Sequence, residues 1–253
     1  MPEAWCKTFD GGEPQRVNKW LAQQGVCSRR EAETLIAQGL VRIDGERVDE
    51  PGRKIEPGQT IEVSQANARV QFSIVLNKPV GFVSAQPESG QIPAARLLTR
   101  ANLHGQSDDI PTKHTSLPPL GRLDQDSRGL LLLSEDGVLA KAVIGPDSAL
   151  DKEYLVRVAG QIDTKKLALL GHGLFLDGRQ LKPAQVSLVG EHVLRFVLRE
   201  GRNRQIRRMC EAVDLGVIDL LRTRIGALEL GSLPEGKWRP LAASERAALL
   251  GRT

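Results

Sequence analysis

An arginine and an aspartate stand two positions apart just before a run of leucines, in the segment GRLDQDSRGLLLL at residues 121–133. Four consecutive leucines predict a strand buried on both faces, or a buried helix segment. Asp124 precedes this rigid element, where a carboxylate is costly unless it is paired. Arg122 shares a face with Asp124 if the chain is extended there. The pattern is typical of an active-site acid, and equally of a structural ion pair at the entrance of a strand.

A basic block, RFVLREGRNRQIRRM, supplies the second group of candidate residues. Gly201 separates a predicted strand from a predicted helix, and arginines gathered at such a turn favour contacts with phosphate over a merely solvated helix face. Few aromatic residues accompany them, so the block favours structured RNA recognised by shape and backbone over stacked single strands. The candidates for these contacts are Arg202, Arg204, Arg207 and Arg208.

Residues 15–63 predict a separate module of two small helices followed by short β elements. Ser28 and Glu31 are spaced as a capping box at the start of the second helix, and Asp44-Gly45 marks a hairpin turn. Cations in a first helical turn oppose the helix dipole, so their presence favours phosphate binding there over a solvated charged face. The candidate phosphate ligands are Arg29 and Arg30, extended by Arg16 and Lys19 on the preceding helix.

Residues 64–72 read as a polar linker, and residues 73–253 as a larger domain. In this domain strands outnumber helices without regular βα alternation, which predicts an α+β fold with a mixed, mainly antiparallel sheet. The stretch 85–119 is irregular apart from a short helix near Ala94–Leu98, and such stretches are usually functional or mobile. Tyr154 lies in a half-buried strand, where local sequence favours a core aromatic with a hydrated hydroxyl group.

The cysteines, histidines and apolar stretches of the chain argue against a metal-binding, secreted or membrane-spanning protein. The three cysteines are far apart and the four histidines form no ligand spacing, so no metal site is expected. Reduced thiols fit a cytosolic protein. No apolar stretch is long enough to span a bilayer and the N-terminus has no secretory signal, so we expect a cytoplasmic protein without membrane contact.

Several motifs in the same order resemble one known family. GRLDQDSRGLLLLSEDG resembles the catalytic motif of RNA pseudouridine synthases, KEYLVRV their tyrosine motif, and GRNRQIRRMCEAV with LLRTRIG their arginine motif and its hydrophobic companion. LNKPVG resembles the strand that opens their catalytic domain, and the N-terminal module resembles an S4 RNA-binding domain. This domain order resembles the ribosomal small- and large-subunit pseudouridine synthases, and QIRRM with RTRIG is most similar to the member that modifies 23S rRNA.

The resemblance implies that the chain isomerises a uridine in structured ribosomal RNA to pseudouridine, with no cofactor, no metal and no obligatory protein partner. It assigns Asp124 as the catalytic carboxylate, acting as nucleophile or as base, and Tyr154 as the residue that stacks on the target base. Arg207 is then the partner of Asp124, Leu220 a wall of the base pocket, and Arg122 a contact to the extruded nucleotide. Two alternatives remain: a non-catalytic S4-type RNA-binding or ribosome-assembly protein, and a tRNA-directed synthase.

Overall fold

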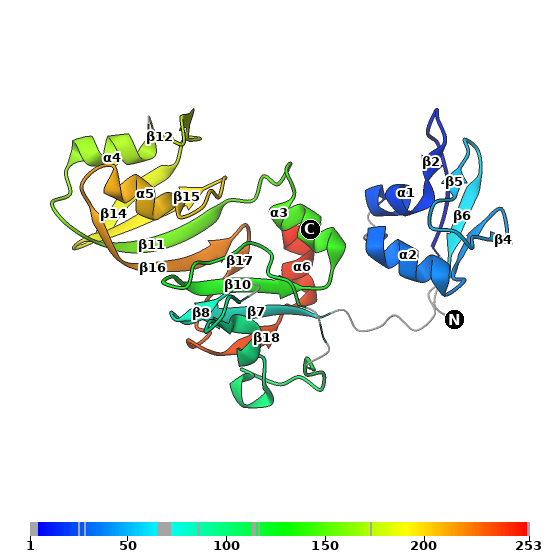
Figure 1. The fold of residues 1–253 in the computed structure, drawn as a ribbon, viewed down its shortest axis with the longest axis horizontal. Helices are drawn as coiled ribbons and strands as arrows, with labels where there is room; N and C mark the ends of the chain where they lie inside the picture. The colour runs from blue at the N-terminus through cyan, green and yellow to red at the C-terminus, as the bar shows by residue number, and fades with distance from the viewer. Residues whose placement is uncertain are drawn as a thin grey trace. The chain divides into compact units, whose positions relative to one another are not determined.

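The computed structural model describes residues 5–24, 26–27, 29–64, 72–84, 87–112, 115, 117–172 and 174–251. The chain folds as two compact units, one of residues 1–71 with 135–141 and the other of residues 72–134 with 142–253 (Figure 1). Among the described residues, no helix is long and apolar enough to cross a membrane.

The N-terminal unit is a small α+β module with its own core. A four-stranded sheet runs in the order β1-β6-β3-β4, and β2 pairs with β5. Because β1 pairs with β6, the sheet also includes a strand that lies before residue 15 and that the sequence pattern did not predict. The elements are β1 (Trp5–Thr8), β2 (Gln15–Arg16), α1 (Val17–Gln23), α2 (Arg29–Ala37), β3 (Val41–Ile43), β4 (Glu46–Arg47), β5 (Lys54–Ile55) and β6 (Thr60–Val63).

The two helices and the hairpin of this unit are those expected from the sequence. Trp20 and Ile36 are buried in a shared core, so each helix turns its apolar face inward. Asp44 and Gly45 both have positive φ, as a tight hairpin turn between β3 and β4 requires. Arg16 directly precedes α1 instead of lying within it. The capping role expected of Ser28 lies outside the described residues.

The larger unit is built on one extended sheet with the order β14-β15-β11-β16-β10-β7-β18, with β17 paired to β16. All neighbouring pairs are antiparallel except β10 with β16, which confirms the mixed, mainly antiparallel sheet. Its sheet strands are β7 (Ser73–Lys78), β10 (Arg128–Ser134), β11 (Lys152–Ala159), β14 (Gln185–Gly190), β15 (Val193–Leu198), β16 (Gly216–Ile225), β17 (Leu228–Glu229) and β18 (Trp238–Pro240).

The remaining elements of this part of the chain cover the sheet or connect its strands. They are β8 (Phe82–Val83), β9 (Ile92–Pro93), the 3₁₀ helices η1 (Ala94–Leu97) and η2 (Arg100–Asn102), α4 (Thr164–Gly171), β12 (Phe175–Leu176), β13 (Arg179–Gln180), α5 (Gln205–Glu211) and α6 (Ala243–Leu249). The helix α3 (Gly137–Ile144) has residues 137–141 in the first unit and 142–144 in the second. The short helix expected near Ala94–Leu98 is therefore confirmed as η1. Ala94 and Leu98 are buried against the sheet, so this part of the irregular stretch is packed.

The leucine run forms β10, an interior strand of the sheet between β16 and β7. Leu130 through Leu133 are fully buried, which confirms a strand covered on both faces. The strand approaches β16 closely at Gly129, where a Cβ atom would lie 2.4 Å from the backbone oxygen of Arg222. Gly129 also has a φ of +106°, so only glycine fits this position without strain. Arg128 and Gly129 pair in parallel with β16, and this pairing fixes the first residues of β10, which follow Asp124 in the chain.

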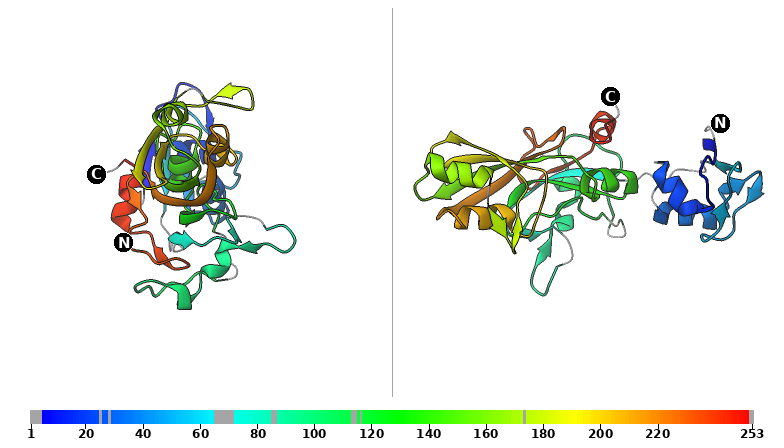
Figure 2. Two further views of the ribbon diagram at one scale, coloured as in Figure 1. Left: turned by 90° about the vertical axis from the view of Figure 1, so that its left-hand side faces the viewer. Right: turned by 90° about the horizontal axis from the view of Figure 1, so that it is seen from above.

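Among the described residues, two hydrophobic clusters of the larger unit meet at Tyr154, which packs against both. One cluster includes residues of α4 and α5, and α4 packs against β14 while α5 packs against β16 (Figure 2). The other packs around Trp238, η1 and the opposite half of the sheet. Tyr154 is only partly buried between them. The strand predicted for KEYLVRV therefore brings its tyrosine to the junction of the two clusters.

Candidate active site

The loop at residues 121–127 holds Asp124 through its own backbone. The hydroxyl group of Ser84, which follows β8, accepts a hydrogen bond from the Leu123 N–H at 2.8 Å and donates one to the Leu123 carbonyl at 2.7 Å. Gly81 donates its N–H to the Gln125 carbonyl at 2.8 Å. Leu123 is buried in the cluster around Trp238. The residues on both sides of Asp124 are therefore fixed, while its carboxylate side chain stays 36% exposed.

Arg222 holds the other end of this loop from β16. The residue is 1% exposed, and its guanidinium group donates to the carbonyls of Leu130 at 2.7 Å, Gly121 at 3.2 Å and Arg122 at 3.4 Å. These three acceptors span the turn and the strand that follows it. Arg222 therefore acts as a backbone clamp, and it leaves a positive charge beneath the loop.

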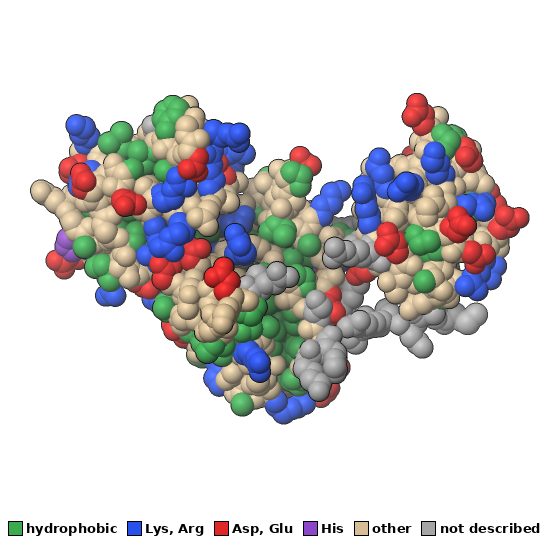
Figure 3. Space-filling view, viewed as in Figure 1, with side chains coloured by type: hydrophobic (Ala, Val, Ile, Leu, Met, Phe, Trp, Pro, Cys, Tyr) green, Lys and Arg blue, Asp and Glu red, His purple; other side chains and the backbone are tan. Residues whose placement is uncertain are grey.

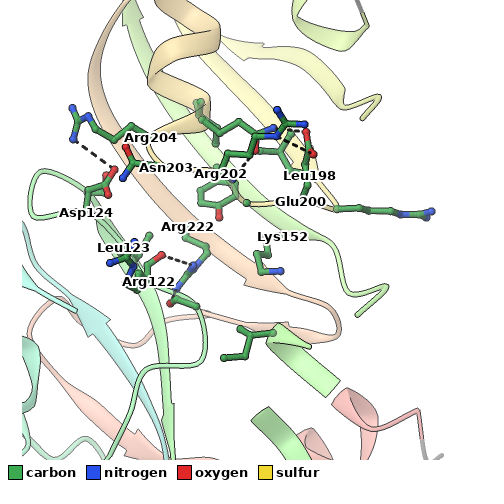
Figure 4. Close-up of a pocket in the computed structure, with 18 of the residues that line it drawn as sticks. Arg122, Leu123, Asp124, Lys152, Leu198, Glu200, Arg202, Asn203, Arg204 and Arg222 are labelled. Carbon is green, nitrogen blue, oxygen red and sulfur yellow. Dashed lines mark hydrogen bonds and ion pairs between the residues drawn. The ribbon is translucent and has the colours of Figure 1, made fainter. Parts of the chain in front are cut away.

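The arginines of the basic block meet the loop, but with a different pairing from the one that the resemblance implies. Arg207 contacts Asp126, with its Nε 3.3 Å from Oδ2 and its Nη2 donating to the backbone carbonyl at 2.7 Å. The ion-pair partner of Asp124 is Arg204, whose Nη1 lies 3.6 Å from Oδ2 (Figure 4). The expected Arg207–Asp124 pair is therefore wrong in this structure. The reason is positional, because Arg204 stands at the start of α5 and Arg207 almost one turn inside it.

Asp126 is the most strongly held carboxylate of the loop. Arg204 donates two hydrogen bonds to it, at 3.2 and 2.9 Å. Burial alone would raise the pKa of Asp126, but these hydrogen bonds and the nearby charge of Arg207 outweigh it and hold the pKa below its ordinary value. Arg204 itself has a φ of +48°, a left-handed conformation that is uncommon for a residue other than glycine. Such strain persists where the surrounding contacts require it.

The remaining arginines of the block are engaged by protein atoms. Arg202 donates to the carbonyls of Leu176 at 3.1 Å and Gln180 at 3.2 Å. Arg208 forms a two-pronged ion pair with Asp177, at 3.0 and 2.7 Å. The block therefore includes arginines that hold the protein together, besides those at the loop.

A pocket of about 430 Å³ lies in the larger unit, between the loop at residues 121–127 and the basic block. Figure 3 shows Lys and Arg side chains gathered on the face of this unit that includes α5. The predicted site residues that line the pocket are Arg122, Asp124, Tyr154, Arg202, Arg204, Arg207 and Leu220. The fold therefore brings together residues that are up to about a hundred positions apart in the chain. Arg208 does not line the pocket, because it pairs with Asp177 in the turn between β12 and β13.

Sequence reasoning missed four residues that build this site: Lys78, Ser84, Lys152 and Arg222. Lys78 is fully buried, and its Nζ donates to the carbonyls of Pro79 and Phe82, both at 2.8 Å. Burial lowers the pKa of Lys78 to about 8, although the carboxylates of Asp126 and Asp124 oppose that shift. The signal was available for Lys78, because the motif LNKPVG contains it. Nothing in the local sequence marks Ser84.

The predicted phosphate ligands of the N-terminal unit lie on its surface. Arg16, Lys19 and Arg29 are all exposed, and Arg29 is the first residue of α2, as expected. The side chain of Arg30 lies outside the described residues.

Comparison with known proteins agrees with this architecture. The RNA pseudouridylate synthase family model matches residues 72–212, and the S4 domain model matches residues 15–61. The chain is 36% identical over 235 residues to the dual-specificity RNA pseudouridine synthase RluF of Escherichia coli O157:H7, covering 91% of this chain and 76% of the relative. It is 34% identical over 240 residues to the ribosomal large subunit pseudouridine synthase B of Bacillus subtilis, covering 91% and 93% of the two chains.

A solved structure described as a pseudouridylate synthase superposes with a TM-score of 0.63 at 28% identity, covering 92% of this chain and 99% of the other. The chain therefore belongs to the RNA pseudouridylate synthase family and carries an S4 domain ahead of its catalytic domain. The resemblance seen in the motifs, the fold class and the enzyme class predicted from them are confirmed.

Proposed function

We propose that this chain converts a uridine of large-subunit ribosomal RNA to pseudouridine, with Asp124 as the catalytic carboxylate. The observation that carries the proposal is the placement of Asp124. Its backbone is fixed on both sides, while its carboxylate stays accessible at a pocket that also contains Tyr154 and Leu220. A reacting group needs both properties, because it must be preorganised and must still reach its substrate.

The neighbouring side chains suit an extruded nucleotide. Leu220 and the ring of Tyr154 offer apolar surface for the uracil base. Arg122 is exposed at the rim, where its guanidinium group can contact a phosphate or sugar oxygen of the same nucleotide. Swinging a base out of its stack costs a few kcal/mol, and such contacts offset that cost. The exposed cations of the S4 domain add affinity for the RNA backbone without contributing to the chemistry.

The isomerisation breaks the bond between the sugar and N1 of uracil and forms a bond from the same sugar to C5. The hydrogen at C5 leaves as a proton and N1 takes up a proton, so the product is an isomer of the substrate. The carboxylate of Asp124 serves this reaction as nucleophile or as base, and either role is lost when the carboxylate becomes an amide. A large-subunit target is supported by the name of the Bacillus subtilis relative and by the resemblance of QIRRM and RTRIG. With such a substrate, we expect the protein to act in the cytoplasm.

The central test is Asp124→Asn, which preserves the shape of the side chain but removes the carboxylate. We expect tritium release from RNA carrying 5-tritiated uridine to be abolished, while RNA affinity and thermal stability stay close to wild type. Asp109→Asn is the matched control, because Asp109 lies in an exposed loop. Release at the wild-type rate from Asp124→Asn would reject Asp124 as the catalytic group.

The RNA target is tested separately. Pseudouridine mapping by carbodiimide and primer extension in cells with and without the gene should show one missing signal in large-subunit rRNA. A missing signal in tRNA alone would support the tRNA-directed alternative. The tRNA fraction must be included, because the RluF relative is described as having dual specificity. Unchanged maps together with intact RNA binding would favour the non-catalytic alternative.

A further inference from the structure

Lys152 is a pocket cation to which neither the motifs nor the proposed chemistry assigns a task. It begins β11 two positions before Tyr154, and alternate residues of a strand project from the same face. Both residues line the pocket. The Lys152 side chain is half-buried, and Figure 4 shows it near Arg222 with no marked interaction to another residue drawn.

The protein offers Lys152 little compensation for its burial. The hydrogen bond found for its Nζ within the described residues is one to the Leu150 carbonyl at 3.5 Å, the limit of such a contact. The carboxylates nearby are engaged by arginines. These pairs are Asp151 with Arg224 at 2.7 Å, Glu153 with Arg195 at 2.9 Å, Glu200 with Arg202 at 3.6 Å and Asp124 with Arg204 at 3.6 Å.

A second cation, Arg222, lies beside Lys152. Three of its five N–H groups bind backbone carbonyls, which satisfy these donors but leave the charge in place. Burial and the charge of Arg222 lower the pKa of Lys152, with Asp151 acting in the opposite direction. Two like charges facing one pocket favour an anion over a neutral acceptor such as a uracil carbonyl, because only an anion relieves their repulsion.

We propose that Lys152 binds a non-bridging oxygen of the phosphate adjoining the target uridine. The ammonium group would hold the nucleotide from the side of Tyr154 while Asp124 approaches the sugar from the opposite loop. The inference rests on the proposed function, because it assigns a ligand within the same pocket. A lysine ammonium group is suited to this task, since it is a compact charge with three rotatable donors.

The test is a double-mutant cycle between the protein and the RNA. Wild type and Lys152→Met are compared on a substrate RNA with normal linkages and on RNAs in which one linkage beside the target uridine, 5′ or 3′, is an uncharged methylphosphonate. On normal RNA we expect Lys152→Met to lower the single-turnover rate at subsaturating enzyme by about 10- to 100-fold, as for loss of a charge-assisted hydrogen bond. At one of the two methylphosphonate positions, the rates of wild type and Lys152→Met should differ by less than about two-fold, because that RNA already lacks the charged oxygen that Lys152 would bind.

Three controls separate this role from a structural one. Lys165→Met removes an exposed lysine of α4 and should leave all rates unchanged. A methylphosphonate five linkages from the target should keep the full difference between wild type and Lys152→Met. Lys152→Arg, which retains the charge, should recover part of the rate on normal RNA.

An equal loss on the normal RNA and on both adjacent methylphosphonate RNAs would overturn the proposal, as would a wild-type rate for Lys152→Met on every RNA. The same comparison can be made without the reaction by measuring the RNA affinity of Asp124→Asn with and without Lys152→Met on the same RNAs. Failure of the proposed function would instead appear as a wild-type protein that releases no tritium from any RNA.

Discussion

Ser84→Ala tests whether the backbone of the catalytic loop must be clamped for activity. The hydroxyl group makes two hydrogen bonds to Leu123, at 2.7 and 2.8 Å, and both residues are buried, at 7% and 6% exposed. Alanine leaves a buried N–H group and a buried carbonyl without this partner. Each such group costs about 1–3 kcal/mol, so we expect a destabilisation of about 2–6 kcal/mol if the loop does not move.

Relaxation of the loop would recover part of this energy at the expense of catalysis. Asp124 is the next residue, so movement of Leu123 toward other partners displaces the carboxylate from its place at the pocket. Misplacement by about 1 Å can cost about a hundred-fold in rate. We therefore expect the single-turnover rate of tritium release at saturating RNA to fall by roughly ten- to a hundred-fold, with RNA affinity within about three-fold of wild type.

The matched control is Ser107→Ala, which removes an exposed hydroxyl group that donates to the Asp109 carbonyl at 2.8 Å. It should leave both the melting temperature and the rate unchanged. A Ser84→Ala variant with the wild-type melting temperature and rate would refute the clamp. A variant that loses stability but keeps the full rate would show that Asp124 is positioned by other contacts, such as those from Arg222.

Two further predictions follow from the arginines. Arg207→Met should raise the pKa of Asp126, which is held below its ordinary value by Arg204 and Arg207 against the effect of burial. Because a lowered carboxylate pKa stabilises the fold above the unfolded-state pKa of about 4, the melting-temperature gap between wild type and Arg207→Met should be widest near pH 7 and narrow as the pH falls below about 4; a gap independent of pH would contradict the ion pair. Replacing Arg29 and Arg30 by alanine should weaken RNA binding and reduce its log–log salt slope by roughly 0.7–0.9 for each lost phosphate contact, with the saturated single-turnover rate preserved. An unchanged slope would make these arginines a solvated helix face, and a collapse of the saturated rate would mean that the S4 domain positions the uridine.

The elements predicted from sequence were those with a strong local signal. The leucine run indicated β10, Asp44-Gly45 predicted the first hairpin, and the alternating segment around Tyr154 predicted β11. The strand β1 and the helices α4 and α6 were not predicted. β1 is exposed at three of its four residues, so it carries little apolar pattern, and its place is set by pairing with β6. That pairing is non-local, and a single stretch of sequence does not encode it.

The residues of the site also fall into those that local motifs predicted and those that only tertiary contacts reveal. Asp124, Tyr154 and Leu220 were singled out from motifs, and the fold places them around one pocket. The ion-pair partner of Asp124 was not predictable from spacing, because it depends on the left-handed backbone of Arg204 at the start of α5. The contacts of Ser84 join residues 39 positions apart, and those of Arg222 join residues about a hundred positions apart. Such tertiary hydrogen bonds leave no local pattern in the sequence.

The buried cations of the site share one property that bears on its chemistry. Lys78 and Arg222 are fully buried, and the hydrogen bonds found for their side chains go to backbone carbonyls. A carbonyl satisfies a donor without cancelling its charge, whereas a carboxylate would do both. The loop that carries Asp124 and Asp126 therefore lies over positive charge that the protein has not neutralised at the contact. This positive charge attracts the phosphates of RNA toward the pocket that Asp124 lines, so the residues that shape the catalytic loop also serve substrate capture.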